Sequence, residues 1–388
     1  MSGIVLSAAV RQNLLSLQST AQLLATTQNR LATGNKVNSA LDNPTNFFTA
    51  QGLNNRASDI NNLLDSIGNG VQVLQAANTG ITSLQKLVDT AKSIANQVLQ
   101  APTGYTTKSS TTSTALPAGS TSANLVDGVA IKSGEIISIA ATTGIPAFTI
   151  TLGASESLAQ LNTSLASSNL TASLNSTNQL VITTTNDAAS STIGAVTLGG
   201  TAGTATFAAA AAPVADANSQ TTRANLVSQY NNIIAQITTT SQDSSFNGIN
   251  LLFGDDLKLT FNETGKSTLT IKGVTYDAAG LGLAPLTAGT DFLDNSSANA
   301  VVAKVSAASD QLRSEASSLG SNLSIVQIRQ DFAKNLINVL QTGSANLTLA
   351  DSNEEAANSQ ALSTRQSIAV SALALANQSQ ASVLQLLR

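Results

Sequence analysis

Residues 305–340 read VSAASDQLRSEASSLGSNLSIVQIRQDFAKNLINVL, and the spacing of their apolar side chains decides the fold. Apolar residues recur at steps of three and four, with Gln330 as the one break. The stripe consists of Val305, Ala308, Leu312, Ala316, Leu319, Leu323, Val326, Ala333, Ile337 and Leu340. This spacing predicts one helix over 297–341, roughly 65 Å long at 1.5 Å per residue. A stripe sustained over that length is typical of a coiled-coil-like bundle.

Both ends of the chain repeat this pattern. The N-terminal stripe consists of Val10, Leu14, Leu17, Ala21, Leu24 and Leu31, and the C-terminal stripe of Leu362, Ala369, Leu373, Ala376, Val383 and Leu387. Each stripe predicts a helix with one apolar face. The first helix should end at Gly34, where a C-terminal glycine belongs, and the last should begin at about Asn353.

Two more helices are predicted over about 45–99 and 219–240, where apolar residues keep the helical period. Asp42 or Asn43 can cap the first of these, and Pro44 fits its first turn. Glycine weakens a helix interior, so we expect three residues to loosen this helix: Gly68, Gly70 and Gly80.

The middle of the chain changes to a period of two, which indicates strands. Strands are predicted within 134–140, 147–152, 179–185 and 192–198, and a short helix within 155–168. Segments rich in Thr, Ser, Ala, Pro and Gly border this part and are interpreted as linkers, at 101–122 and 204–217. A β-hairpin is predicted at about 256–273. The fold class is therefore α+β: a long antiparallel helical bundle from both termini, a hairpin and an inserted β-rich domain.

Composition excludes several function classes. Charged residues make up 10% of the 388, against roughly 25% in typical soluble domains, and the net charge is −4. No basic cluster exists, so a nucleic-acid partner is not expected. The chain has no cysteine and no histidine, so we expect no disulfide, no metal site and no cofactor. Neither a membrane-spanning run of about 18 apolar residues nor a cleaved signal peptide is expected.

The segment from Gln366 to Leu387 has no ionisable side chain. Coiled coils in solution usually carry charges beside the seam, but here Gln, Ser and Asn occupy those positions. An uncharged outer face on these helices is explained if other copies of the same chain cover it. An ordinary bundle that closes on itself is an equally weighted alternative on charge alone.

Adjacent carboxylates occur at two places, Asp255-Asp256 and Glu354-Glu355. A glycosidase-like acid and base pair would need such residues. Both pairs lie beside turns or helix starts, where acids cap backbone groups or complement the helix dipole. We favour the structural role, so no catalytic residue is predicted.

Three separated motifs then resemble one family. The first, NRLATGNKVNSALDNP, places Arg30, Leu31, Gly34, Asn38, Ser39 and Asp42 as in the conserved N-terminal segment of bacterial flagellins. The second, FNGINLL, begins with Phe246, Asn247 and Gly248. The third is the ending ALANQSQASVLQLLR. The resemblance covers about 1–100 and 219–388, while 43–46 depart from the usual small residues and 148–185 resemble the IN motif of flagellins and hook-associated proteins.

The resemblance implies a structural subunit that polymerises into the flagellar filament, secreted by type III export and not an enzyme. Residues 1–42 and 345–388 would form the inner tube and be disordered in the monomer. Residues 43–102 and 216–344 would form the helical shell, and 103–215 the surface-exposed domain. The implied partners are other copies, an export chaperone, and the hook-associated and cap proteins.

Two alternatives remain at this point: a hook–filament junction protein and a membrane-active type III translocator. A translocator helix would be expected to have a basic polar face, which this chain lacks. The resemblance also implies weak or absent recognition by the flagellin-sensing Toll-like receptor. Val88-Asp89-Thr90 stands where the family usually has Arg-Glu-Leu.

Overall fold

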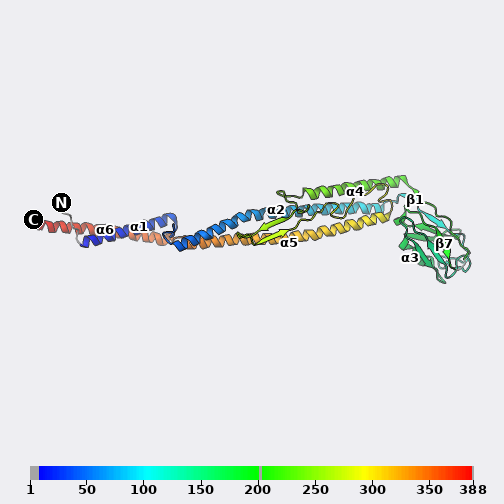
Figure 1. The fold of residues 1–388 in the computed structure, drawn as a ribbon, viewed down its shortest axis with the longest axis horizontal. Helices are drawn as coiled ribbons and strands as arrows, with labels where there is room; N and C mark the ends of the chain where they lie inside the picture. Colours follow the sequence, from blue (N-terminus) through cyan, green and yellow to red (C-terminus); the bar gives the residue numbers. More distant parts are fainter. Residues whose placement is uncertain (1–7, 201–202, 387–388) are drawn as a thin grey trace. The chain divides into compact units, whose positions relative to one another are not determined.

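The computed structural model describes residues 8–200 and 203–386 and confirms the α+β class (Figure 1). Five long helices carry most of the chain: α1 (Ala8–Thr33), α2 (Pro44–Gln100), α4 (Ala217–Asp243), α5 (Asn295–Thr348) and α6 (Ser352–Leu386). The described residues form two compact units, one within 1–70, 258–269 and 325–388, the other within 71–257 and 270–324. Long helices follow from the sustained apolar stripes and from the absence of proline inside them.

In the first unit, α1 and α6 lie side by side and antiparallel (Figure 1). The beginning of α2 packs against the end of α5 through a small apolar cluster consisting of Ala57, Ile60, Ala333, Ile337 and Leu340. The predicted hairpin is present as β9 (Leu257–Thr260) and β10 (Thr268–Ile271). Its turn contains Gly265 at φ +69°, a left-handed conformation that favours glycine.

Glycines in α2 permit close packing, so the expectation that they loosen the helix was wrong. A Cβ at Gly70 would lie 2.5 Å from Cδ2 of Leu259 on the hairpin. In the second unit, a Cβ at Gly80 would lie 2.7 Å from Cδ1 of Leu252. The helix stays continuous because its packing partners outweigh the intrinsic cost of glycine, about 1 kcal/mol each.

Helix α4 lies along α2 in the second unit, and a buried arginine joins their ends to the start of α5 (Figure 1). The guanidinium of Arg223 donates to the carbonyls of Val98, Ala101, Pro102 and Phe292 at 2.6–3.1 Å. Burial lowers the pKa of Arg223. The free carbonyls at the C-terminus of α2 supply the negative partial charge that this cation needs.

The β-rich part contains two three-stranded antiparallel sheets and one strand pair. One sheet has the order β2–β6–β5 and the other β4–β3–β7. Their strands are β2 (Ser110–Thr112), β3 (Ile136–Ile139), β4 (Phe148–Thr151), β5 (Leu170–Leu174), β6 (Leu180–Thr184) and β7 (Val196–Gly199). The helix α3 (Leu158–Leu165) starts with a capping box of Ser157 and Gln160. A shared apolar core includes Leu125, Ile137, Leu161 and Ile182.

The linker interpretation of the bordering segments was wrong. Strand β1 (Tyr105–Thr107) pairs with β8 (Val214–Ala215), and β2 pairs with β6. Strand β5 was also not predicted. Threonine has a β-branched side chain that fits strands, so the Thr-rich run at 105–114 pairs where composition alone indicated a linker.

Candidate self-assembly surface

The side chains that α1 and α6 bury against each other form a seam, which keeps the predicted helical period but contains fewer large apolar residues than the two predicted stripes. On α1 the buried or half-buried seam residues are Val10, Leu17, Thr20, Leu24 and Thr27, and on α6 they are Glu355, Leu362, Gln366, Ala369, Leu373 and Ala376. The hydroxyl of Thr20 donates to the Ser16 carbonyl at 2.8 Å, so this polar group is satisfied within its own helix. Leu387 and the side chain of Val383 lie outside the described residues.

Two leucines of the predicted N-terminal stripe lie outside the seam. Leu14 is 37% exposed and Leu31 is 43% exposed. An α-helix has 3.6 residues per turn, so a row of side chains spaced 3.5 residues apart on average moves gradually around the helix axis. As a result, the side chains that face α6 include Thr20 and Thr27 in place of some of the predicted leucines. These leucines therefore lie on the outer surface of the helical pair.

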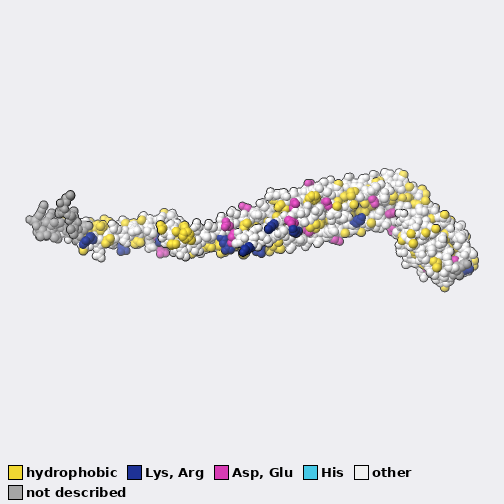
Figure 2. Space-filling model, in the orientation of Figure 1, with side chains coloured by type: hydrophobic (Ala, Val, Ile, Leu, Met, Phe, Trp, Pro, Cys, Tyr) yellow, Lys and Arg dark blue, Asp and Glu magenta, His cyan; other side chains and the backbone are white. Residues whose placement is uncertain are grey.

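Further apolar side chains cover that outer surface, and the sequence analysis did not identify them. They are Leu15, Leu23, Ile368, Val370 and Leu375, all more than half exposed. Figure 2 shows hydrophobic side chains along this pair and a dense group where α1 ends and α2 begins. Counting apolar residues on every face, rather than on one stripe, would have revealed them. Monomeric proteins rarely expose so many large apolar residues together, so the surface indicates an interface.

The connection from α1 to α2 is held by backbone pairing to the end of α5. Gly34 has φ +70°, as expected of a residue that ends a helix. The amides of Lys36 and Val37 donate to the carbonyl of Thr348 at 2.7 and 3.3 Å. In return, the amide of Ala350 donates to the carbonyl of Gly34 at 2.9 Å.

Asp42 closes the turn within this connection. Its carboxylate accepts from the amides of Asn38 and Ser39 at 3.0 and 2.8 Å, and from the Ser39 hydroxyl at 3.1 Å. These hydrogen bonds, the Ser39 amide first, lower the pKa of Asp42. Asn43 caps α2 instead, accepting from the amide of Asn46 at 3.0 Å. The family-motif residues of this segment thus have structural roles.

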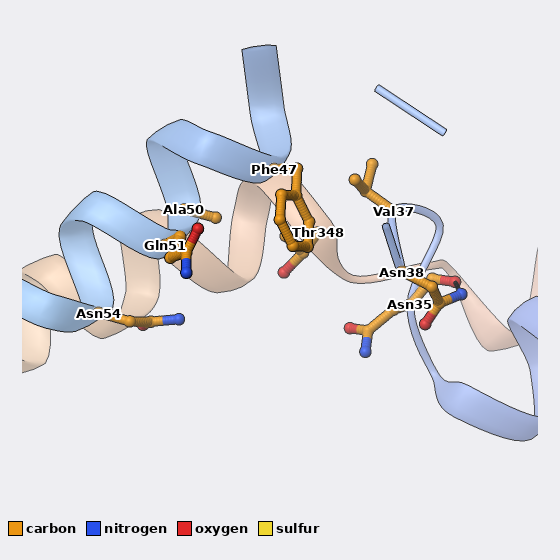
Figure 3. A pocket seen from close by; sticks show the side chains of 8 residues that line it. All are labelled: Asn35, Val37, Asn38, Phe47, Ala50, Gln51, Asn54 and Thr348. Carbon is orange, nitrogen blue, oxygen red and sulfur yellow. Dashed lines mark hydrogen bonds between the residues drawn. The ribbon is translucent and has the colours of Figure 1, made fainter. Parts of the chain in front are cut away.

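A cavity of about 300 Å³ lies between this connection and α2 (Figure 3). Phe47 and Ala50 line it from α2, and Val37 lines it from the connection. The other lining residues are uncharged: Asn35, Asn38, Gln51, Asn54 and Thr348. The amide and apolar side chains offer no acid or base, and the Thr348 hydroxyl donates to the carbonyl of Ser344 in its own helix, so the cavity does not resemble a catalytic site.

The second motif forms a tight turn after α4. Asn247 and Gly248 have φ of +50° and +79°, and Phe246 and Ile249 exchange backbone hydrogen bonds of 3.0 Å. Two successive residues with positive φ are typical of a type I′ turn. Asn250 then fixes the turn, because its side-chain amide donates to the carbonyls of Ser241 and Gln242.

Three of the four adjacent carboxylates have structural partners. The carboxylate of Asp255 accepts from the backbone amide of Asn250 at 2.8 Å, and Asp256 forms an ion pair with Lys272. Glu355 pairs with Arg30 at 3.2 Å. Among the described residues, the structure contains no group of three or more Asp and Glu side chains that could hold a metal ion. None of the helices described is long and apolar enough to span a bilayer.

Comparison with known proteins gives matches at both ends of the chain. Residues 5–117 match the family model of the bacterial flagellin N-terminal helical region, and 302–387 match that of the C-terminal helical region. Together these matches cover about half of the chain and leave 118–301 unmatched.

Individual relatives agree with the family models. Flagellin FljM of Caulobacter vibrioides is 33% identical over 165 residues, which is 42% of this chain and 59% of the relative. Flagellin FljK of the same organism is 32% identical over the same share of both chains. Flagellin A of Rhizobium meliloti is 38% identical over 90 residues, 23% of each chain. The matches thus span 59% of the length of FljM and FljK.

Proposed function

Because the chain belongs to the bacterial flagellin family, we propose that it is a structural subunit that polymerises into the extracellular flagellar filament used for swimming. One observation carries the proposal: the helical pair α1–α6 exposes large apolar side chains on its outer faces, far from its own seam. Covering these faces with other copies would remove them from water, which favours assembly by about 25 cal/mol per Å² of apolar surface.

The helical pair has a seam that is weak by itself. Thr20, Thr27 and Gln366 occupy positions where a stable coiled coil has large apolar residues. We therefore expect α1 and α6 to be disordered in the free subunit and to fold on assembly. Disorder in the free subunit explains how an uncharged C-terminal segment stays in solution before it is buried.

The proposal assigns each segment of the chain to a part of the filament. Residues 1–42 and 345–388 would line the inner tube, and 43–102 and 216–344 would form the surrounding shell. Residues 103–215 would be exposed on the filament surface. Residues 148–185 contain β4, α3, β5 and β6, and a small β/α module is what the resemblance to the IN motif implies.

A hook–filament junction protein is the second candidate. It would share the apolar terminal helices but would not elongate. The relatives named above are flagellins by name, which favours the filament subunit. An enzymatic role has no support in the carboxylate pairs, because at least one member of each pair has a structural partner.

Partners other than the chain itself follow from the family alone. An export chaperone would bind the disordered C-terminal segment, and hook-associated and cap proteins would contact the filament ends. We also expect weak or no activation of the Toll-like receptor that senses flagellin. Val88 is fully buried, and Asp89 is exposed beside it, so no arginine is presented at this place. A reporter-cell response equal to that of an enteric flagellin would contradict this expectation.

Seeded polymerisation tests the proposed function. Purified chain is added to short filament fragments and examined by electron microscopy. Long tubular filaments are expected. A chain that only blocks the fragment ends, without elongation, would support the junction protein. Leakage of liposomes without any polymer would support a membrane-active role.

A further inference from the structure

Helix α5 carries a second apolar stripe that the helical bundle does not use. Its residues are Ile325, Ile328, Phe332 and Val339, and they are 42%, 65%, 59% and 66% exposed. Their spacing of three, four and seven residues keeps them on one face of the helix. The stripe spans roughly 21 Å at 1.5 Å per residue, long enough for several turns of a partner helix.

This stripe points away from the seam of the same helix. The seam side chains Val326, Ala333, Ile337 and Leu340 are at most 9% exposed. At 100° per residue, the centres of the two faces lie about 120° apart around α5. The packing of α5 onto α2 therefore cannot cover the second stripe, and a different surface has to.

A preformed cavity of about 230 Å³ adjoins the stripe at Phe332. Ile60, Ala333 and Leu336 contribute apolar lining, and the hairpin turn contributes Phe261. Its rim is fixed by an ion pair between Arg56 and Glu263, at 2.7 Å. The guanidinium of Arg329 lies 5.7 Å from the ring centre of Phe261, within the range of a cation–π interaction. The combination of a cavity and neighbouring apolar anchors is typical of the centre of a protein interface.

We propose that the second stripe of α5, together with this cavity, docks a second copy of this chain. The inference rests on the proposed function and names a contact that would build the polymer. Charge favours this occupant. Asp331 and Lys334 beside the stripe pair with each other at 3.7 Å, and Arg56 pairs with Glu263 at the cavity rim, so these charges are neutralised within the subunit, while Arg329 packs against the ring of Phe261. This chain, with only 10% charged residues, supplies neutral surface of the required kind.

The chain also supplies apolar side chains that can enter such a cavity. Leu41 is 95% exposed and Phe48 is 61% exposed, and neither lines the cavity of its own subunit. A protruding side chain and a cavity at different places on one molecule give a head-to-tail contact between copies. Contacts of this kind generate open helical polymers.

A matched pair of charge substitutions tests the docking surface. Ile328→Asp places a carboxylate in the stripe, while Gln327→Asp places one on the same helix about 100° away, at an exposed position. Both variants should keep the helical content of the monomer. In seeded polymerisation, Ile328→Asp should reduce the mass of filament at least tenfold, while Gln327→Asp should match the wild type.

Labelling of single cysteine variants measures the accessibility of the same positions without placing a charge in the proposed interface. The natural chain has no cysteine, so Ile328→Cys and Gln327→Cys each carry one thiol. Maleimide should label both in the monomer. In filaments, labelling of the Ile328→Cys variant should slow at least tenfold relative to the Gln327→Cys variant.

The outcomes separate the two proposals. Failure of the wild type to polymerise would overturn the proposed function and this inference with it. Normal filaments from Ile328→Asp, or equal labelling of the two thiols in filaments, would overturn the inference alone. Loss of filaments with Ile328→Asp only, together with protection of the Ile328→Cys thiol, would establish the surface.

Discussion

The guanidinium of Arg30 lies 3.2 Å from the carboxylate of Glu355, and this ion pair joins the end of α1 to the start of α6. The Glu355 side chain is 10% exposed and that of Arg30 is 40% exposed. The pair therefore lies at the seam, partly screened by water on the arginine side. It sets the register of two helices whose seam is otherwise poor in large apolar side chains.

Removing the arginine should weaken the pairing of α1 with α6. Arg30→Gln leaves a mostly buried carboxylate without its cation, which we expect to cost about 1–2 kcal/mol after allowing for the exposed arginine. The exchange Arg30→Glu with Glu355→Arg should restore part of the loss. Thermal melting of filaments, followed by circular dichroism, measures the effect. Arg365→Gln on the exposed side of α6 is the control and should change little.

Acid should loosen the connection between α1 and α2 through Asp42. The hydrogen bonds from Ser39 and Asn38 hold its folded pKa below the ordinary value of 3.8. A group with a depressed folded pKa stabilises the fold above its unfolded pKa, and this contribution disappears as pH falls through the folded pKa. In filaments, exchange of the Asn38 and Ser39 amides should therefore accelerate below about pH 4, beyond the intrinsic pH effect. Asp42→Asn should abolish this acid-dependent acceleration, and an unchanged profile in that variant would refute the assignment.

Two helix glycines should respond to alanine with opposite signs. A methyl group at Gly80 meets Cβ of Ser244 and Cδ1 of Leu252, each at 2.7 Å, so Gly80→Ala should destabilise the subunit by about 1–3 kcal/mol. Gly320 has nothing within 4 Å of its virtual Cβ and lies inside α5. Gly320→Ala should stabilise by about 0.5–1 kcal/mol. Urea unfolding of the two variants measures both, and equal signs would contradict the packing described here.

The β-rich part should be dispensable for making a filament. Its incoming and outgoing strands pair at Tyr105 and Ala215, and the amide of Asp216 donates to the carbonyl of Gly104 at 2.9 Å. The two ends of 105–215 are therefore adjacent, and a Gly-Ser turn can replace the segment while the contacts of Arg223 remain. Electron microscopy should show thinner, smoother filaments. A folded, exported variant that does not polymerise would show that this segment makes obligatory contacts between subunits.

The long helices were predictable because one apolar stripe identifies a helix without knowledge of its neighbours. The period over 305–340 predicted the start of α5 to within two residues and its end to within seven, and local chemistry identified the caps at Gly34 and Asn43. These features depend on residues close in the sequence. The hairpin at β9 and β10 was predictable for the same reason, since only seven residues separate its two strands.

Other features depend on distant partners and could not be predicted from local patterns. The close approach of Leu259 explains Gly70, and the carbonyls of two other segments explain the burial of Arg223. The position of Thr20 in the seam, and the exposure of Leu14, depend on where α6 lies. Strand β1 is recognisable only through its partner β8, more than 100 residues later.

Hydrogen exchange compares the same amides in the free subunit and in the polymer, and so measures whether other copies of the chain order the terminal helices. We expect amides of 8–40 and 353–386 to exchange quickly in a verified monomer and to become protected in filaments, while the core of α2 and α5 is protected in both. Leu373→Asp, which places a carboxylate in the α1–α6 seam, should prevent this protection by preventing polymerisation. Slow exchange of both terminal segments in the monomer, unchanged in the presence of filament seeds, would contradict the claim that other copies of the chain complete this structure.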